Sequence, residues 1–277
     1  MSKYFKALCI LFSLSFSGMV MSSSNSSSFY FVSDNVCVSK ADVSIVGGKA
    51  VFKITSNLIC GDMPIKLLSL QNEQLLLSND KSETHIYDQA TYDKKGQVKG
   101  VGSYFSPDGG RYFYVLGMYD SGFFKESKDG KVESVLDKNM YSLEKVLNIS
   151  DNSYVFGDSK KLWVTKSTDE EAKLFSEQCS LLGAYKLDSL FCFDRKNRKI
   201  NVLSLNGNVQ KSLDIDDITF PVTYLPELNM LLAVRGRLGN TGLQDYEAIL
   251  VDPEKGNIVE SDTSFLLSIS QVAVDKI

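Results

Sequence analysis

Short apolar runs recur along the chain at intervals of about forty residues. Each run holds three to five residues, mostly Leu, Phe, Tyr and Val, and is followed by a polar or glycine-containing turn. The runs start at Leu75, Tyr112, Tyr154, Leu190 and Met230, so consecutive starts differ by 37, 42, 36 and 40 residues. A repeat of this period is typical of architectures in which similar units stack or form a ring.

The repeating unit reads as four β-strands. A continuous apolar run of this length predicts a strand that is buried on both faces. A second strand follows each run, and a tight turn such as Lys128-Asp129-Gly130 or Leu205-Asn206-Gly207 comes next. Asp-Gly and Asn-Gly supply the positive φ angles that tight hairpins need. Four strands in about forty residues is the pattern of a β-propeller blade.

The two ends of the chain predict how the ring closes. Five units are complete, and a sixth stops after residues 272–275, two strands short. A spare hairpin near the N-terminus, residues 43–46 and 50–54, would complete it. We therefore expect an all-β propeller of six four-stranded blades, the last of which is closed by N-terminal strands, leaving no exposed sheet edge. A β-sandwich is the rival fold, but it predicts no forty-residue period.

One turn carries a family resemblance. Ser106-Pro107-Asp108-Gly109-Gly110 precedes the strand that starts at Arg111. It resembles the Ser-Pro-Asp-Gly turn in blades of the Tol-system periplasmic propeller and related propeller families. The resemblance covers one blade and implies the fold only, because propellers serve many unrelated functions.

The N-terminal residues have the plan of a secretory signal peptide. Lys3 and Lys6 precede an apolar stretch at residues 7–16, and small residues follow. This stretch is too short to span a bilayer. We expect a signal peptide at residues 1–22, a flexible serine-rich leader at 23–30 and a single propeller domain at 31–277. Cleavage after Ser17 or Ser22 fits equally well. The mature protein is expected to be periplasmic or extracellular.

The cysteines agree with export. Cys9 falls in the signal peptide, and four cysteines remain. Of the three pairings that four cysteines allow, we favour Cys37–Cys60 and Cys179–Cys192, because each pair brackets a stretch that reads as neighbouring strands. Free buried thiols are the alternative. No Cys-x-x-Cys or Cys/His cluster is present, so structural zinc is not expected.

Composition and motifs exclude several function classes. The net charge of −4 offers no basic face for nucleic acid, and no later segment is apolar enough to span a membrane. His85 is the only histidine, which excludes multi-histidine metal centres. No nucleophile elbow and no phosphate-binding Gly-rich loop occurs. We expect a monomer whose partner is a protein or a small-molecule ligand.

An aspartate recurs just after the apolar run of most units. These positions are expected to ring one face of the propeller, and they are Asp80, Asp120, Asp158, Asp194 and, in the half-unit, Asp275. Clustered carboxylates can coordinate Ca²⁺ or hold a cationic or sugar ligand. Aspartate is also favoured in turns, because its side chain bonds its own backbone. The turn-forming role is the simpler interpretation, and no cofactor is predicted beyond Ca²⁺ as a candidate.

The fifth unit breaks this pattern. Arg235 and Arg237 replace the aspartate, and the following connection, residues 236–247, is longer than its counterparts. It adds Asn240, Asp245 and Tyr246 as candidate ligand-binding residues, since long loops on rigid scaffolds often carry binding. A tolerated surface insertion is the alternative.

The sequence thus favours an exported propeller that binds a partner through one face, without catalysis. The alternative is a carboxylate-dependent enzyme, such as a glycoside hydrolase or a lyase-like enzyme, using aspartates of that face. Glycoside hydrolysis requires two acidic side chains facing each other about 5–10 Å apart.

Overall fold

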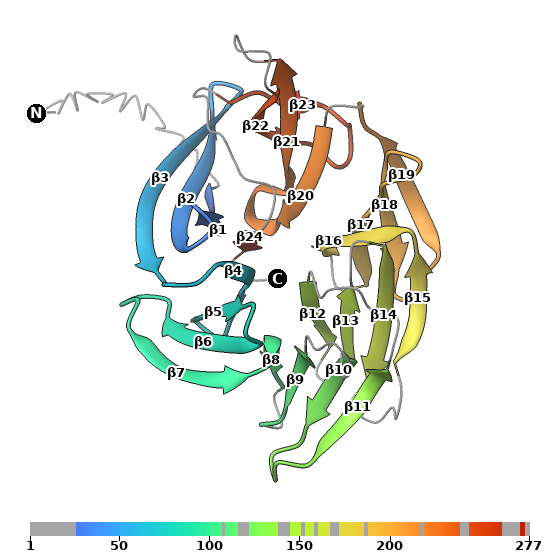
Figure 1. Ribbon diagram of the computed structural model, residues 1–277. Coiled ribbons are helices and arrows are strands. Elements are labelled where there is room, and N and C mark those ends of the chain that lie inside the picture. Colours follow the sequence, from blue (N-terminus) through green and yellow to red (C-terminus); the bar gives the residue numbers. More distant parts are fainter. Residues whose placement is uncertain are drawn as a thin grey trace, which may run out of the picture.

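The chain folds into a ring of six four-stranded antiparallel sheets, which confirms the predicted six-bladed propeller (Figure 1). The computed structural model describes residues 26–106, 109–115, 122–137, 145–150, 153–157, 160–166, 172–185, 188–216, 219–238, 244–261 and 272–274. Within each blade the strands follow one another as a meander, and the first strand lies nearest the centre of the ring.

Blades 1 to 5 follow the chain in order. Blade 1 contains β4 (Ile65–Gln71), β5 (Gln74–Asn79), β6 (Glu83–Asp88) and β7 (Lys94–Lys99), and blade 2 contains β8 (Val101–Phe105), β9 (Arg111–Val115), β10 (Gly122–Glu126) and β11 (Val132–Asp137). Blade 3 contains β12 (Lys145–Ser150), β13 (Ser153–Gly157), β14 (Lys161–Lys166) and β15 (Lys173–Glu177), and blade 4 contains β16 (Cys179–Tyr185), β17 (Ser189–Asp194), β18 (Lys199–Ser204) and β19 (Val209–Asp214). Blade 5 contains β20 (Thr219–Leu225), the 3₁₀ turn η1 (Pro226–Leu228), β21 (Met230–Leu238), β22 (Gln244–Val251) and β23 (Ile258–Val259).

Blade 6 joins the two ends of the chain. Its innermost strand is β24 (Val272–Val274), and the other three strands are β1 (Ser26–Ser33), β2 (Cys37–Val46) and β3 (Lys49–Cys60). Closure by N-terminal strands is confirmed, but the N-terminus supplies three strands and not only the predicted hairpin. The leader expected at residues 23–30 is wrong from Ser26 onward. The serines at residues 26–28 are typical of a flexible segment, but the rest of β1 is apolar, and Phe29 and Phe31 are buried. The expected signal peptide lies outside the described residues.

The second strand of a blade explains the recurring apolar runs. Along β17, Leu190 and Cys192 pack between blades 3 and 4, whereas Phe191 and Phe193 pack between blades 4 and 5. Successive side chains of a strand point to opposite faces, so a strand between two blades needs apolar residues at every position. This confirms the prediction that the apolar runs are strands buried on both faces.

The core is therefore divided among the junctions between blades. The junction of blades 2 and 3 is the most aromatic, with a stack that runs from Tyr112 through Phe123 and Phe156 to Trp163. The junction of blades 5 and 6 combines Phe29 of β1 with aliphatic side chains of β21 such as Leu232 and Val234. The first and last strands of the ring are thus held by the same kind of packing as the strands of the complete blades.

Two disulfides tie strands within blades, in the predicted pairing. Cys37 and Cys60, with Cα atoms 4.1 Å apart, link β2 to β3. Cys179 and Cys192, with Cα atoms 5.6 Å apart, link β16 to β17. Disulfides are typical of oxidising compartments, so both bonds are consistent with export. No described helix is long and apolar enough to cross a bilayer.

The strand order gives the ring two distinct faces. Antiparallel strands alternate in direction, so the turns after first and third strands lie on one side and the turns after second strands lie on the other. We call the first side, with the β4–β5 turn, the β6–β7 turn and η1, the cavity face. The second side, with the β5–β6 turn, the β17–β18 turn and the links between blades, is the connection face. The described members of the predicted aspartate ring, Asp80 and Asp194, follow second strands and lie on the connection face.

Candidate functional site

The described members of the aspartate ring do not converge. Asp80 is exposed in the β5–β6 turn of blade 1, and Asp194 ends β17 in blade 4, on the opposite side of the ring. Asp120, Asp158 and Asp275 lie outside the described residues. In the described part of the chain, no group of three or more His, Cys, Asp or Glu side chains is placed to hold a metal ion. Calcium at this ring stays a prediction.

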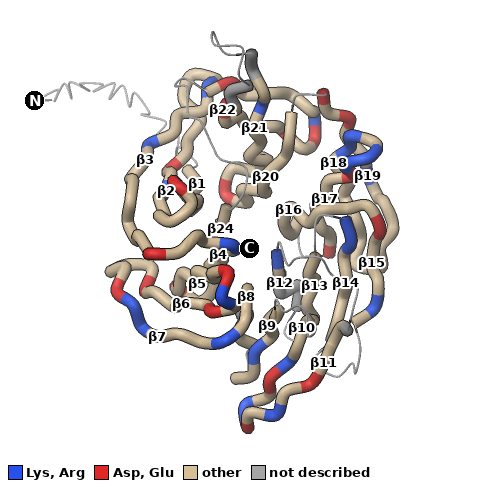
Figure 2. The backbone as a smooth tube through the Cα atoms, in the orientation of Figure 1, with Lys and Arg blue, Asp and Glu red and all other residues tan. Residues whose placement is uncertain are grey.

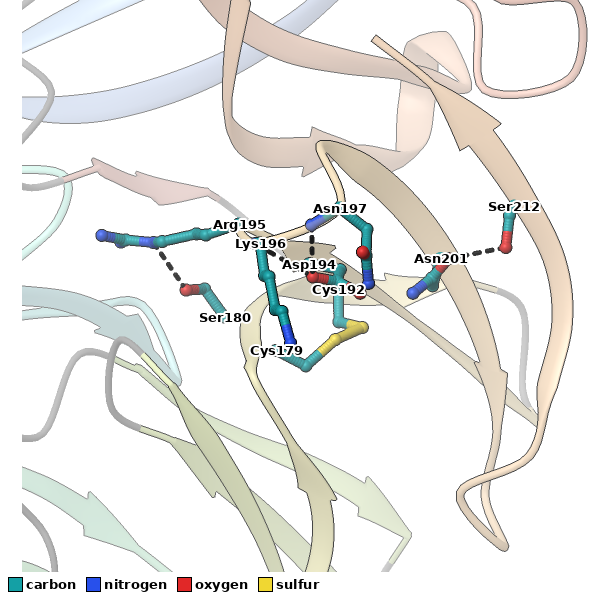
Figure 3. The surroundings of a disulfide bond; sticks show 9 residues. All are labelled: Cys179, Ser180, Cys192, Asp194, Arg195, Lys196, Asn197, Asn201 and Ser212. Carbon is teal, nitrogen blue, oxygen red and sulfur yellow. Dashed lines mark hydrogen bonds between the residues drawn. A yellow bond between two sulfur atoms is a disulfide. The ribbon is translucent and has the colours of Figure 1, made fainter.

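Asp194 acts as a turn-forming residue (Figure 3). Its Oδ1 accepts hydrogen bonds from the backbone N–H groups of Lys196 and Asn197, both at 3.0 Å, and its Oδ2 accepts one from the Asn197 amide at 2.7 Å. The neighbouring Arg195 extends away from this turn and donates to Ser180 Oγ at 3.1 Å. This geometry matches the simpler of the two interpretations of the recurring aspartates.

The candidates of the fifth unit lie largely in strands. The long connection expected at residues 236–247 is shortened by the ends of β21 and β22, where Arg237 is paired in register with Asp245. Arg235 has a mostly buried side chain that forms an ion pair with Glu260. The Tyr246 ring packs edge-on against Phe220, with centroids 6.5 Å apart. Asn240 lies outside the described residues. Arg235 and Tyr246 thus have structural contacts at the junction of blades 5 and 6.

His85 offers no catalytic arrangement. It lies within β6, and its Nε2 is 4.0 Å from Glu83 Oε2. Burial and the nearby Lys94 lower the pKa of His85, while Glu83 acts in the opposite direction. The single histidine is therefore a half-buried strand residue.

A cavity opens on the cavity face of the ring, where blades 5, 6 and 1 meet. Its volume is about 730 Å³. The start of β1 forms one wall with Ser26, Ser27, Ser28 and Tyr30, beside Lys40 of β2. The turns of blade 1 form a second wall with Glu73, Asp88, Gln89, Ala90 and Tyr92, and Glu227 of η1 completes the lining.

Hydrogen bonds fix the blade 1 wall. Asp88 Oδ1 accepts from the backbone N–H groups of Thr91 at 2.9 Å and Ala90 at 3.0 Å, which together with nearby Lys95 hold the pKa of Asp88 below its usual value. The backbone N–H of Gln89 donates to the Glu73 carbonyl at 2.9 Å. The β6–β7 turn and the β4–β5 turn are therefore joined to each other and present their side chains in a defined arrangement.

The wall of blade 5 is fixed through η1. Asn229 ends this turn in the left-handed region, at φ 50°, and its side chain accepts a hydrogen bond from the Tyr224 hydroxyl at 2.8 Å. Burial, with smaller contributions from Tyr185 and Glu227, raises the pKa of Tyr224 to about 12, so this hydroxyl remains a donor at neutral pH. Ser27 Oγ donates to Glu227 Oε2 at 2.7 Å, which joins blade 6 to blade 5.

The β1 wall carries a paired charge. Ser28 Oγ donates to Asp42 Oδ1 at 2.6 Å, and Lys40 Nζ lies 3.1 Å from the same oxygen. The Ser28 hydroxyl and the Lys40 ammonium hold the pKa of Asp42 below its usual value, against the opposing effect of partial burial. Lys40 is thus neutralised locally, and the remaining lining charges, Glu73, Asp88 and Glu227, make the cavity acidic.

Sequence reasoning missed this cavity for a definable reason. Its residues come from η1, an irregular turn of blade 1 and the serine-rich start of β1, and none of them recurs from blade to blade. A search for positions that recur from blade to blade cannot find a site whose residues occur only once. The sequence contained one usable signal, the segment Ser26–Ser33, which forms β1 beside the cavity. The interpretation of residues 23–30 as a flexible leader hid this signal.

Comparison with known proteins supports the fold. No family model and no curated protein matches the sequence. The WD40 propeller domain of Doa1 is similar with a TM-score of 0.55 and 12% identity, covering 90% of this chain and 86% of that one. A Bacteroides caccae protein of unknown function is similar with a TM-score of 0.55 and 10% identity, covering 90% and 98%.

A third similar structure is hydrazine synthase of Kuenenia stuttgartiensis, with a TM-score of 0.52 and 12% identity. This match covers 72% of the present chain and 66% of that one, slightly under two thirds. Identities this low support a shared propeller architecture and carry no activity from one protein to the other. The Tol-like turn joins β8 to β9, and Pro107 and Asp108 lie outside the described residues, so that resemblance stays a prediction.

Proposed function

We propose that this chain is an exported, monomeric binding or scaffold module that recognises a protein or small ligand through the cavity face, without catalysis of its own. The observation that carries the proposal is the cavity at the junction of blades 5, 6 and 1. Binding sites favour concave surfaces with a few positioned polar groups, and here such groups project from turns held by hydrogen bonds. Similarity to a WD40 propeller is compatible with this role.

The charge distribution supports a localised site. Lysine, arginine and acidic positions are interspersed along the outer strands and turns of the ring (Figure 2). A surface of mixed sign provides no extended field for a highly charged partner. The acidic lining of the cavity is a local departure from this mixture, which supports recognition at the cavity.

The enzymatic alternative has weaker support. Carboxylate catalysis requires two acidic side chains on either side of a reacting bond. Asp80 and Asp194, the described members of the predicted ring, lie three blades apart. No observation on the described residues favours this alternative over binding.

Site-specific photocrosslinking tests the proposal. A photoreactive residue is introduced at Ala90, exposed on the cavity rim, and separately at Lys81, exposed on the connection face. We expect a discrete crosslinked partner from Ala90 and none from Lys81 when the protein is expressed in its source cells. The identified partner is then purified, and Ala90→Arg is expected to weaken its affinity about tenfold or more, whereas Lys81→Glu is not. Crosslinking from Lys81 alone would contradict the proposal.

A further inference from the structure

The cavity offers hydrogen-bond acceptors that no described residue uses. The Glu73 carboxylate has no hydrogen-bonding or ion-pairing partner within the described part of the chain. Glu227 also lines the cavity, and it uses Oε2 for Ser27, whereas its Oε1 has no hydrogen-bond partner among the described residues. The Tyr92 ring packs against the junction of blades 6 and 1, and its hydroxyl likewise has no described partner. A ligand that fits these groups has to donate hydrogen bonds at several points.

The acceptors are spread and do not meet at one point. Glu73 belongs to the β4–β5 turn of blade 1, whereas Glu227 belongs to η1 of blade 5, across the start of β1. The described carboxylates form no group that could hold a metal ion. A compact cation would satisfy one of them and leave the others unmatched. An extended molecule with a hydroxyl group on each side satisfies several acceptors at once, through hydrogen bonds strengthened by the carboxylate charge.

From this arrangement we propose that the cavity binds a short saccharide, with ligand hydroxyls donating to Glu73 and Glu227 and exchanging hydrogen bonds with Tyr92. The inference rests on the proposed function and names the ligand class of the same site. The volume of about 730 Å³ lies within the range of roughly 300–1,000 Å³ that is usual for small-molecule sites. The two turns of blade 1 are already joined through Gln89, so little ordering cost remains for binding.

Saturation-transfer NMR on the purified protein tests the ligand class. The probes are maltose, cellobiose and N,N′-diacetylchitobiose, each at about 10 mM, so that affinities near 1 mM are visible. Putrescine serves as the cationic probe. We expect at least one disaccharide to bind and putrescine not to compete with it.

Matched variants locate the bound probe. Glu73→Gln replaces a charged acceptor by an amide of the same shape and is expected to weaken the disaccharide about tenfold, because hydrogen bonds to charged groups are the stronger ones. Tyr92→Phe removes one hydroxyl and is expected to weaken it severalfold. Asp80→Asn makes the same kind of change on the connection face and is expected to leave the affinity unchanged.

The outcomes separate this inference from the proposed function. Binding of putrescine with no disaccharide binding overturns the saccharide assignment and keeps the cavity as a binding site. Disaccharide binding that weakens with Asp80→Asn but not with Glu73→Gln places the ligand on the other face and overturns the inference. If no disaccharide binds, the inference fails, and crosslinking from Ala90 still decides whether the face recognises a partner.

Discussion

On the connection face, Asp194 accepts hydrogen bonds from its own turn with both carboxylate oxygens. On the cavity face, Glu73 and Glu227 line the cavity and keep carboxylate oxygens without a partner among the described residues. Both disulfides also lie near the connection face. The residues that line the cavity do not recur from blade to blade. The contrast supports the proposal that binding occurs at the non-repeating turns of the cavity face, while Asp194 maintains its blade.

The largest expected effect comes from removing a disulfide near the connection face. The Cys37–Cys60 bond closes a separation of 23 residues, and the Cys179–Cys192 bond closes one of 13. In the chain-entropy model each contributes about 3 kcal/mol to the free energy of unfolding. Replacing both cysteines of one pair by alanine should lower that free energy by about this amount, measured by urea unfolding through the fluorescence of Trp163, the single tryptophan. Disaccharide binding should persist below the unfolding transition.

A smaller loss is expected at Asp194. Asp194→Ala removes two backbone acceptor contacts in the β17–β18 turn and should cost about 1–2 kcal/mol of unfolding free energy. Asp194→Asn keeps one acceptor oxygen and should cost less. The same urea titration measures both variants. A large loss of ligand affinity with normal stability would show that this aspartate binds and does not merely form the turn.

Arg235→Ala should also act on stability. The substitution breaks the ion pair with Glu260, beside the hydrogen bond from the Ala50 N–H to the Glu260 carbonyl that links blade 5 to blade 6. We expect a loss of about 1 kcal/mol, because the Arg235 side chain is mostly buried. Arg235→Lys should recover part of it. If the Arg235→Ala variant binds ligand more weakly while its unfolding free energy is unchanged, Arg235 is a binding residue after all.

Acid should loosen the cavity face through Asp42. The pKa of Asp42 is lowered in the folded protein, so its ion pair stabilises the fold above the unfolded-state pKa of about 3.8 and is lost as the pH falls through the lower folded value. Asp42→Asn should therefore flatten the dependence of the unfolding free energy on pH below about pH 4. Urea titrations between pH 2 and 6 measure this slope. An unchanged slope in the variant would mean that Ser28 and Lys40 do not hold Asp42 in this way.

The smallest effect is expected at Asp80. Its side chain is exposed in a turn, and Asp80→Asn should change the free energy of unfolding by less than about 0.5 kcal/mol. It should leave ligand affinity unchanged. The variant is therefore the reference against which changes on the cavity face are judged.

The fold was largely readable from the sequence because burial on two faces leaves a strong signal. Runs such as Leu190-Phe191-Cys192-Phe193 place alternate side chains in two different junctions between blades. The spacing of these runs along the chain predicted the number of blades. Cys37–Cys60 and Cys179–Cys192 followed from strand adjacency. β1 was missed, because its first three residues are serines, and the hydrogen bonds of Ser27 and Ser28 go to Glu227 and Asp42, groups distant in the chain.

The candidate site was not readable in the same way. Glu73 and Glu227 are exposed acidic residues in turns, and the sequence does not distinguish them from other solvated turn residues. Their placement in one cavity, on either side of the start of β1, depends on ring closure, because blade 6 brings blade 5 close to blade 1. Such a site becomes visible only once the ring is assembled.

The most direct test of the central claim is a paired crosslinking measurement in the source cells. The photoreactive residue at Ala90 reports on the cavity face, and the one at Lys81 reports on the connection face, both from exposed positions on blade 1. The account predicts a specific partner or ligand adduct from Ala90, suppressed by Glu73→Gln, and none from Lys81. A specific adduct from Lys81 with none from Ala90 would contradict it.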